Sequence, residues 1–163
     1  MAVEYLNRKG QKYYLHQGTT KTGKPKYFFS MKSEGNLVKN IPDGFEIYEN
    51  PNAQVFLRRT QPKIISDEEI ATVDKGVKRF SSLQYYQIDV KKDAIHVYIP
   101  NQNVAGLSEI FSELSFRKSV DIQNQLARSI SYSPVVRFVL DDEQKRIFMT
   151  ERFCFLGSVD DWI

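Results

Sequence analysis

Apolar and polar positions alternate with period two in the first part of the chain, which is the period of β-strands. In KYFFSMK, residues 26–32, the odd positions Tyr27, Phe29 and Met31 share one face, and the even positions share the other. KYYLHQ, residues 12–17, has the composition of a strand as well. The two runs therefore predict a β-hairpin.

Further strand-like runs follow in pairs, each pair joined across a polar turn. They are 45–49 with 54–59, 85–90 with 94–100, and 134–140 with 146–155. The run 134–140, PVVRFVL, is apolar at nearly every position, which predicts a central strand with both faces covered. Hairpins fix which strands are neighbours but not the order in which the hairpins join.

The period changes to that of a helix in SDEEIATVDKGVKRF, residues 66–80. Ser66 followed by Glu69 is a capping box, acidic residues fill the first turn, and basic residues fill the last. The apolar stripe consists of Ile70, Val73, Val77 and Phe80. Amphipathic spacing predicts two more helices, over 106–114 and 119–130.

Together these elements predict an α+β fold for the 163 residues, in a single domain. We expect a largely antiparallel sheet of about three hairpins, packed with two or three helices. Residues 1–63 form the hairpin-rich half, and residues 64–163 follow the order helix, hairpin, helix, hairpin. The high aromatic content, 13%, agrees with a prominent sheet.

The sequence contains no run of about 20 apolar residues, as a membrane span requires, and its first residues lack the apolar core of a secretion signal. These features predict a cytoplasmic protein. The single cysteine, Cys154, has no partner for an internal disulfide, and its aromatic neighbours predict a small buried apolar residue rather than a nucleophile.

Charge is distributed unevenly along the chain. Residues 1–63 hold 11 Lys and Arg against 5 Asp and Glu, whereas residues 64–163 hold 12 against 15. Between Tyr5 and Ser33 there are seven basic residues, several aromatic residues and no acidic residue. A face that gathers these side chains would attract phosphates and could stack on unpaired bases.

This pattern predicts a non-enzymatic module that binds nucleic acid or another polyanion through the first hairpin. The candidate contacts are Lys12, Tyr14, Lys21, Lys24, Lys26, Phe28, Lys32 and Arg58. The simpler interpretation is that Tyr27 and Phe29 fill the core and the lysines keep an edge strand soluble. Exposure of Tyr14, Phe28 and Phe56 would favour the binding interpretation, because these residues fall on the face opposite the expected core.

The stretch GTTKTGKP, residues 18–25, differs by one residue from a phosphate-binding loop. Gly18, Gly23 and Lys24 have the required spacing, but Pro25 replaces the hydroxyl residue that binds magnesium. A strand pattern follows, where a phosphate loop requires a helix. We interpret the stretch as a long hairpin loop and expect no nucleotide cofactor.

Catalytic and metal-binding signals are weak. His16 and His96 are the only histidines, and a zinc or iron site would need carboxylates from elsewhere to complete its ligands. DDEQK, residues 141–145, resembles the end of a nuclease signature but has the composition of an exposed turn. We therefore assign no catalytic residue, metal or cofactor, and keep a small hydrolase built on a histidine and carboxylates as a third hypothesis.

A protein-interaction subunit of a larger bacterial assembly is the second hypothesis. Its contacts would come from the acidic second half, at residues 141–143 and at Trp162 near the end of the chain. The oligomeric state does not follow from the sequence.

Two blocks of sequence resemble a group of uncharacterised bacterial proteins. The first runs from KYYLHQGTTKTGKPKYFFS through GFEIYENPNAQVFLRR, and the second comprises SPVVRFVLDDE and ERFCFLGSVDDWI. The resemblance implies a bacterial, cytoplasmic origin and carries no activity or site residue.

Overall fold

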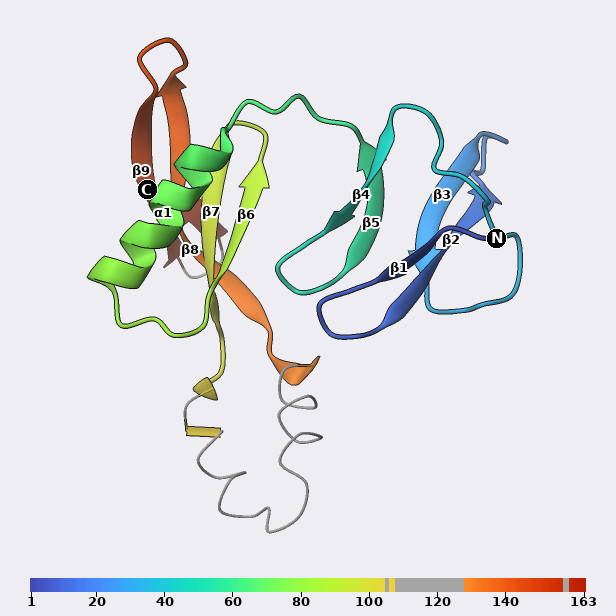
Figure 1. Ribbon diagram of the computed structural model, residues 1–163, viewed down its shortest axis with the longest axis horizontal. Helices are drawn as coiled ribbons and strands as arrows, with labels where there is room; N and C mark the ends of the chain where they lie inside the picture. Colours follow the sequence, from blue (N-terminus) through green and yellow to red (C-terminus); the bar gives the residue numbers. More distant parts are fainter. Residues whose placement is uncertain (105, 108–127, 157–158) are drawn as a thin grey trace. The chain divides into compact units, whose positions relative to one another are not determined.

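The computed structural model describes residues 1–104, 106–107, 128–156 and 159–163 (Figure 1). The chain divides into two compact units, Met1–Gln61 and Pro62–Ile163. This division falls close to residue 63, where the sign of the net charge changes.

The expected fold class is wrong. The described residues are mainly β, with 45% of them in strands and 14% in helices, and in this part of the chain one helix stands beside sheets of three, two and five strands. The first unit contains strands and no helix, so no helix packs on its sheets. The helices predicted over 106–114 and 119–130 fall largely on residues 108–127, which lie outside the described residues.

The first unit consists of a three-stranded sheet and a two-stranded sheet, both antiparallel. Their strands are β1 (Glu4–Leu6), β2 (Lys12–Thr19), β3 (Pro25–Ser30), β4 (Phe45–Glu49) and β5 (Val55–Arg59). The order in the first sheet is β1-β2-β3, and β4 pairs with β5. The first two predicted hairpins are therefore confirmed.

Side chains of alternate strand positions build the core of this unit. Leu15 on β2 is completely buried, and Val55 on β5 is 5% exposed. Tyr27 on β3 packs on Phe45 of β4, with ring centroids 6.1 Å apart. The alternation assigned Tyr27 and Met31 to the core face. Tyr27 is covered by Phe45, as predicted, whereas Met31, just beyond β3, is exposed.

Two turns of the first unit use the same local sequence, Asn-x-x-Gly/Ala-Gln. Asn7 precedes the turn between β1 and β2, and its side-chain oxygen accepts the backbone N–H groups of Lys9 and Gln11 at 3.1 and 2.7 Å. Asn50 does the same for Asn52 and Gln54, both at 3.0 Å. The fourth residue of each turn has positive φ, 71° at Gly10 and 62° at Ala53. This is the geometry of a type I turn followed by a left-handed residue.

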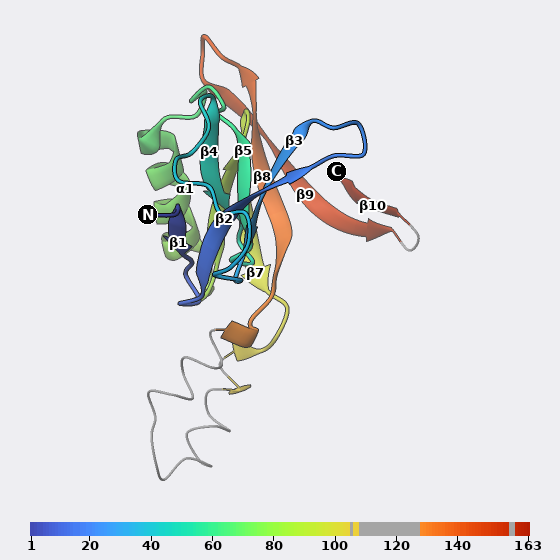
Figure 2. The ribbon, with the colours of Figure 1, turned by 90° about the vertical axis from the view of Figure 1, so that its right-hand side faces the viewer.

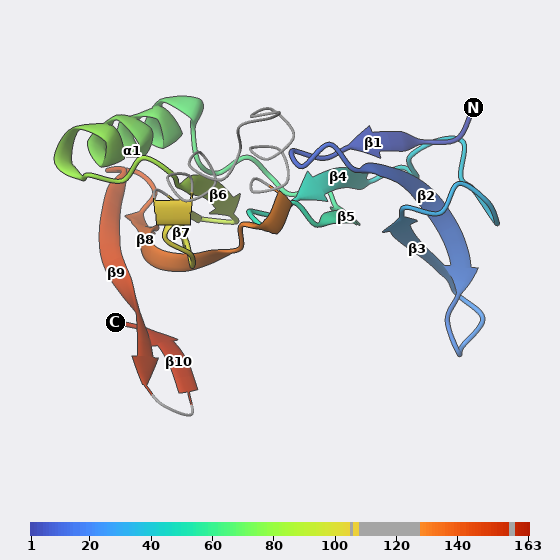
Figure 3. The same cartoon turned by 90° about the horizontal axis from the view of Figure 1, so that it is seen from below.

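The second unit is a five-stranded antiparallel sheet with the helix α1 (Asp67–Phe80) against one face (Figures 2 and 3). Its strands are β6 (Gln87–Lys91), β7 (Ala94–Pro100), β8 (Tyr132–Asp142), β9 (Ile147–Leu156) and β10 (Val159–Trp162). Their order is β10-β9-β8-β7-β6, so β8 is the central strand, as predicted. The expected cover on both of its faces is not found, because every residue of β8 is at least partly exposed.

The capping box predicted for α1 is present. Ser66 Oγ accepts the backbone N–H of Glu69, and the Glu69 carboxylate accepts the backbone N–H of Ser66. Arg146, in the turn between β8 and β9, binds the same carboxylate through two nitrogens, at 2.7 and 2.6 Å. This pair ties the start of the helix to the sheet. The far end is less covered than the apolar stripe predicts, because Phe80 is 82% exposed.

Among the residues that the structure describes, no helix is long and apolar enough to cross a membrane.

Candidate nucleic-acid interface

The register of β2 and β3 places the candidate contacts of the first hairpin. Tyr14 pairs with Ser30, His16 with Phe28, and Gly18 with Lys26. These positions share one face, and the buried Leu15 lies on the other. Phe28 is 43% exposed, whereas Tyr14 is half-buried. The hairpin therefore presents an aromatic ring on the face opposite its core.

The turn of this hairpin is shorter than the sequence predicted. β2 continues to Thr19 and β3 begins at Pro25, so five residues connect them instead of eight. Gly23 has a φ of 78°, and Thr20 Oγ1 accepts the Lys24 N–H at 3.1 Å. The stretch that resembles a phosphate loop is a tight hairpin turn followed by a strand. It projects beyond the other strands of the first unit (Figure 3).

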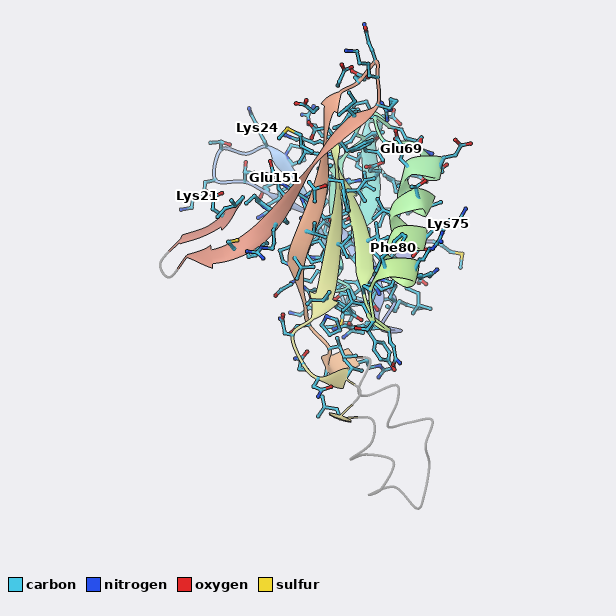
Figure 4. All side chains as sticks on the ribbon, turned by 90° about the vertical axis from the view of Figure 1, so that its left-hand side faces the viewer. Lys21, Lys24, Glu69, Lys75, Phe80 and Glu151 are labelled. Carbon is cyan, nitrogen blue, oxygen red and sulfur yellow. The ribbon has the colours of Figure 1, made fainter. Side chains whose placement is uncertain are left out.

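Four lysines lie in the same hairpin as Phe28 or directly after it. Lys21 and Lys24 occupy the turn, as Figure 4 shows, Lys26 lies on β3, and Lys32 follows that strand. All four are exposed, and within the described part of the chain none forms a salt bridge. We call Lys21, Lys24, Lys26, Phe28 and Lys32 the basic hairpin face.

His16 supports the ring of Phe28 from the neighbouring strand. The two rings are stacked, with centroids 5.4 Å apart and an interplanar angle of 11°. His16 is 6% exposed, and its Nε2 lies 3.0 Å from the carbonyl oxygen of Lys32. Because a carbonyl can only accept, Nε2 carries the proton and donates it in this bond. The histidine thus holds both the aromatic ring and the backbone of Lys32 in place.

Two of the predicted contact residues, Lys12 and Arg58, already form ion pairs with carboxylates of neighbouring strands. Lys12 Nζ lies 3.0 Å from Glu4 on β1, and the hydrogen bond to this carboxylate raises the pKa of Lys12. Arg58 Nε lies 2.7 Å from Glu46 on β4, and its guanidinium covers the ring of Tyr48 at 4.1 Å. Each already pairs with a carboxylate, so we leave both residues out of the basic hairpin face.

Sequence reasoning missed a row of charged side chains in the second unit. Asp89, His96, Arg137 and Glu151 are successive cross-strand partners on β6, β7, β8 and β9. Arg137 and Glu151 form a salt bridge of 2.5 Å. The ring of Trp162 on β10 lies over Arg137, at 4.4 Å, and meets His96 edge-on, at 5.5 Å. Only the register reveals this row, because its members are far apart in the sequence.

His96 is a buried member of this row whose protonation is disfavoured. It is 6% exposed, and its Nδ1 is buried without a hydrogen-bond partner in the described part of the chain. Burial lowers the pKa of His96, and the nearby positive charges of Lys91 and Arg137 lower it further, while the carboxylate of Asp89 offsets part of this effect. The ring is therefore neutral at physiological pH, since protonation would place a charge beside two others.

The lowered pKa of His96 predicts a loss of stability in acid. The unfolded chain takes up a proton near pH 6.5, but the folded protein resists it, so the free energy of unfolding falls as the pH drops below 6.5. His96→Phe removes this titration and should flatten the decline. Urea unfolding of the protein and the variant at pH 7.5 and 5.0 measures the difference. An equal decline in both proteins would contradict the account.

The row does not form a metal site. Among the described residues, no three His, Cys, Asp or Glu side chains lie in an arrangement that could hold a metal ion. The two histidines belong to separate units, His16 to the first and His96 to the second. The cysteine, Cys154, is half-buried on β9.

No family model matches the sequence, and no curated protein and no solved structure is similar enough to be matched.

Proposed function

We propose that this protein binds single-stranded nucleic acid in the cytoplasm through the basic hairpin face. The observation that carries the proposal is the exposure of Phe28 on the face of the hairpin opposite Leu15. Four exposed lysines of the same hairpin or directly after it form no salt bridge with any residue that the structure describes.

The lysines supply attraction without sequence preference. Lysines that contact phosphates release bound counterions, which makes binding strongly dependent on salt. Lys21 and Lys24 project from a tight turn, and Lys26 lies on the adjoining strand, so their side chains can follow a phosphate backbone along the hairpin. These contacts alone would hold any polyanion.

The ring of Phe28 supplies the preference for single strands. A base can stack on an aromatic side chain only if it is free of its partner strand, and such stacking contributes ~1–3 kcal/mol per base. His16 fixes the ring before binding, so little side-chain freedom is lost when a base stacks. A duplex, whose bases are already stacked, would contact the lysines alone.

Fluorescence anisotropy with labelled single-stranded DNA, single-stranded RNA and duplex DNA tests the proposal at 50 and 200 mM salt. We expect both single strands to bind more tightly than the duplex, and all affinities to fall steeply with salt. Absence of binding at 50 mM salt would refute the proposal and direct attention to protein partners.

Phe28→Ala should weaken binding to single-stranded DNA about 5- to 150-fold, the equivalent of the stacking energy. Affinity for duplex DNA should change little, because the duplex does not use the ring. Phe80→Ala is the matched control, since Phe80 is 82% exposed but lies on α1 in the second unit. Equal losses in the two variants, or equal losses for single strands and duplex, would count against a stacking role.

A further inference from the structure

An apolar cavity of about 550 Å³ lies between α1 and the sheet of the second unit. Ile95, Phe138 and Phe148, on three adjacent strands, form its floor. Val73 and Val77 of α1 line the opposite side. The volume falls within the range of roughly 300–1,000 Å³ that small-molecule sites have.

Gly76 leaves free space on the helix side of this cavity. It lines the cavity from the middle of α1, and a Cβ added there would meet no atom within 4 Å. Packing therefore does not require a glycine, and its φ is not in the positive range. Glycine lowers helix stability by about 1 kcal/mol relative to alanine. Because position 76 carries no side chain, the cavity has free space next to this part of the helix.

The two charged residues that line the cavity, Glu69 and Arg146, form an ion pair with each other. Arg146 binds both carboxylate oxygens of Glu69 and also donates to the carbonyl of Ile64 at 3.0 Å. The Arg146 guanidinium lowers the pKa of Glu69 to about 2, so the pair stays ionised at neutral pH. Thr72 beside them donates its hydroxyl to the carbonyl of Glu68. A charged ligand would find no free counter-charge here.

We infer that this cavity is a binding site for a neutral, apolar small molecule, such as an aromatic or short aliphatic compound. The apolar floor and roof offer contacts to an apolar ligand, and the pairing of Glu69 with Arg146 disfavours an anionic or cationic head group. The site belongs to the second unit and does not depend on nucleic-acid binding.

Fluorescence titration with N-phenyl-1-naphthylamine, a neutral apolar dye, tests the inference. We expect saturable binding to one site with a blue shift in emission, and at least 10-fold weaker binding of the anionic dye 8-anilinonaphthalene-1-sulfonate. Gly76→Leu places a side chain in the cavity and should weaken binding of the neutral dye at least 10-fold. Lys75→Leu is the matched control, because Lys75 points away from the sheet and should leave binding unchanged (Figure 4).

Val73→Phe fills the cavity one turn earlier and provides a second test if Gly76→Leu fails to fold. Circular dichroism and thermal unfolding identify the folded variants. The inference is overturned if the unmodified protein shows no saturable binding, if a folded cavity-filling variant keeps its affinity, or if the anionic dye binds equally well.

Discussion

Replacing Lys21, Lys24 and Lys26 with glutamate is expected to weaken binding to single-stranded DNA by about 100-fold or more at 50 mM salt. Three attractive contacts with phosphates become repulsive, and each contact contributes about 0.7 to the slope of log affinity against log salt for a single strand. The slope should therefore decrease by about 2. Anisotropy titrations at four salt concentrations measure both quantities.

The control for this variant carries the same change in net charge. Lys63, Lys75 and Lys145 are exposed lysines of the second unit, and their replacement by glutamate also changes the net charge from +3 to −3. If attraction depended on the overall charge, both variants would lose affinity equally. The proposed interface requires that the control variant retain most of its affinity and its salt slope.

Leu15→Ala is expected to destabilise the protein by about 2–5 kcal/mol. Leu15 is completely buried, and truncating a leucine in a packed core removes apolar contacts and leaves a cavity. Its backbone also connects two other segments of the first unit, since its N–H donates to the carbonyl of Val3 at 3.1 Å and its carbonyl accepts the N–H of Val38 at 2.9 Å. Urea unfolding measures the loss.

Leu6→Ala is the matched control for this substitution. Leu6 lies on β1 and is 64% exposed, so its truncation should change the free energy of unfolding by less than about 0.5 kcal/mol. Similar losses in the two leucine variants would show that β2 does not bury the face that the structure assigns to the core.

Period-two alternation predicted most strands of this protein from sequence alone. It succeeded where one face of a strand is buried, as at Tyr27 on β3, because burial of that face fixes the register. It missed β1 and β10, which are three and four residues long and pair through backbone hydrogen bonds. Val159–Trp162 contains two adjacent aspartates, so its composition does not indicate a strand.

The helix α1 was predicted correctly because its signals are local, whereas the expected packing of two or three helices on the sheet is not found in the described part of the chain. Ser66 and Glu69 are three residues apart, so the capping box is visible in the sequence. The pairing of Glu69 with Arg146, 77 residues later, is set by the fold and has no sequence signature. Amphipathic spacing also overestimated how much of the apolar stripe of α1 is buried, since Phe80 belongs to the stripe but is exposed.

The candidate interface was predicted in part. The alternation placed Lys26 and Phe28 on the face opposite the core, and the structure agrees. The ion pairs of Lys12 and Arg58 could not be foreseen, because they depend on strand neighbours, β1 for Lys12 and β4 for Arg58. The support of Phe28 by His16 likewise depends on the register of β2 and β3.

Titration of ¹⁵N-labelled protein with an unstructured oligo(dT), followed by NMR, tests the central claim most directly. We expect the largest shifts of backbone amide signals within residues 18–32, on the hairpin that carries Lys21, Lys24 and Phe28, and much smaller shifts in Pro62–Ile163. Unchanged spectra, or shifts concentrated in the second unit, would contradict the proposal that the basic hairpin face binds single-stranded nucleic acid.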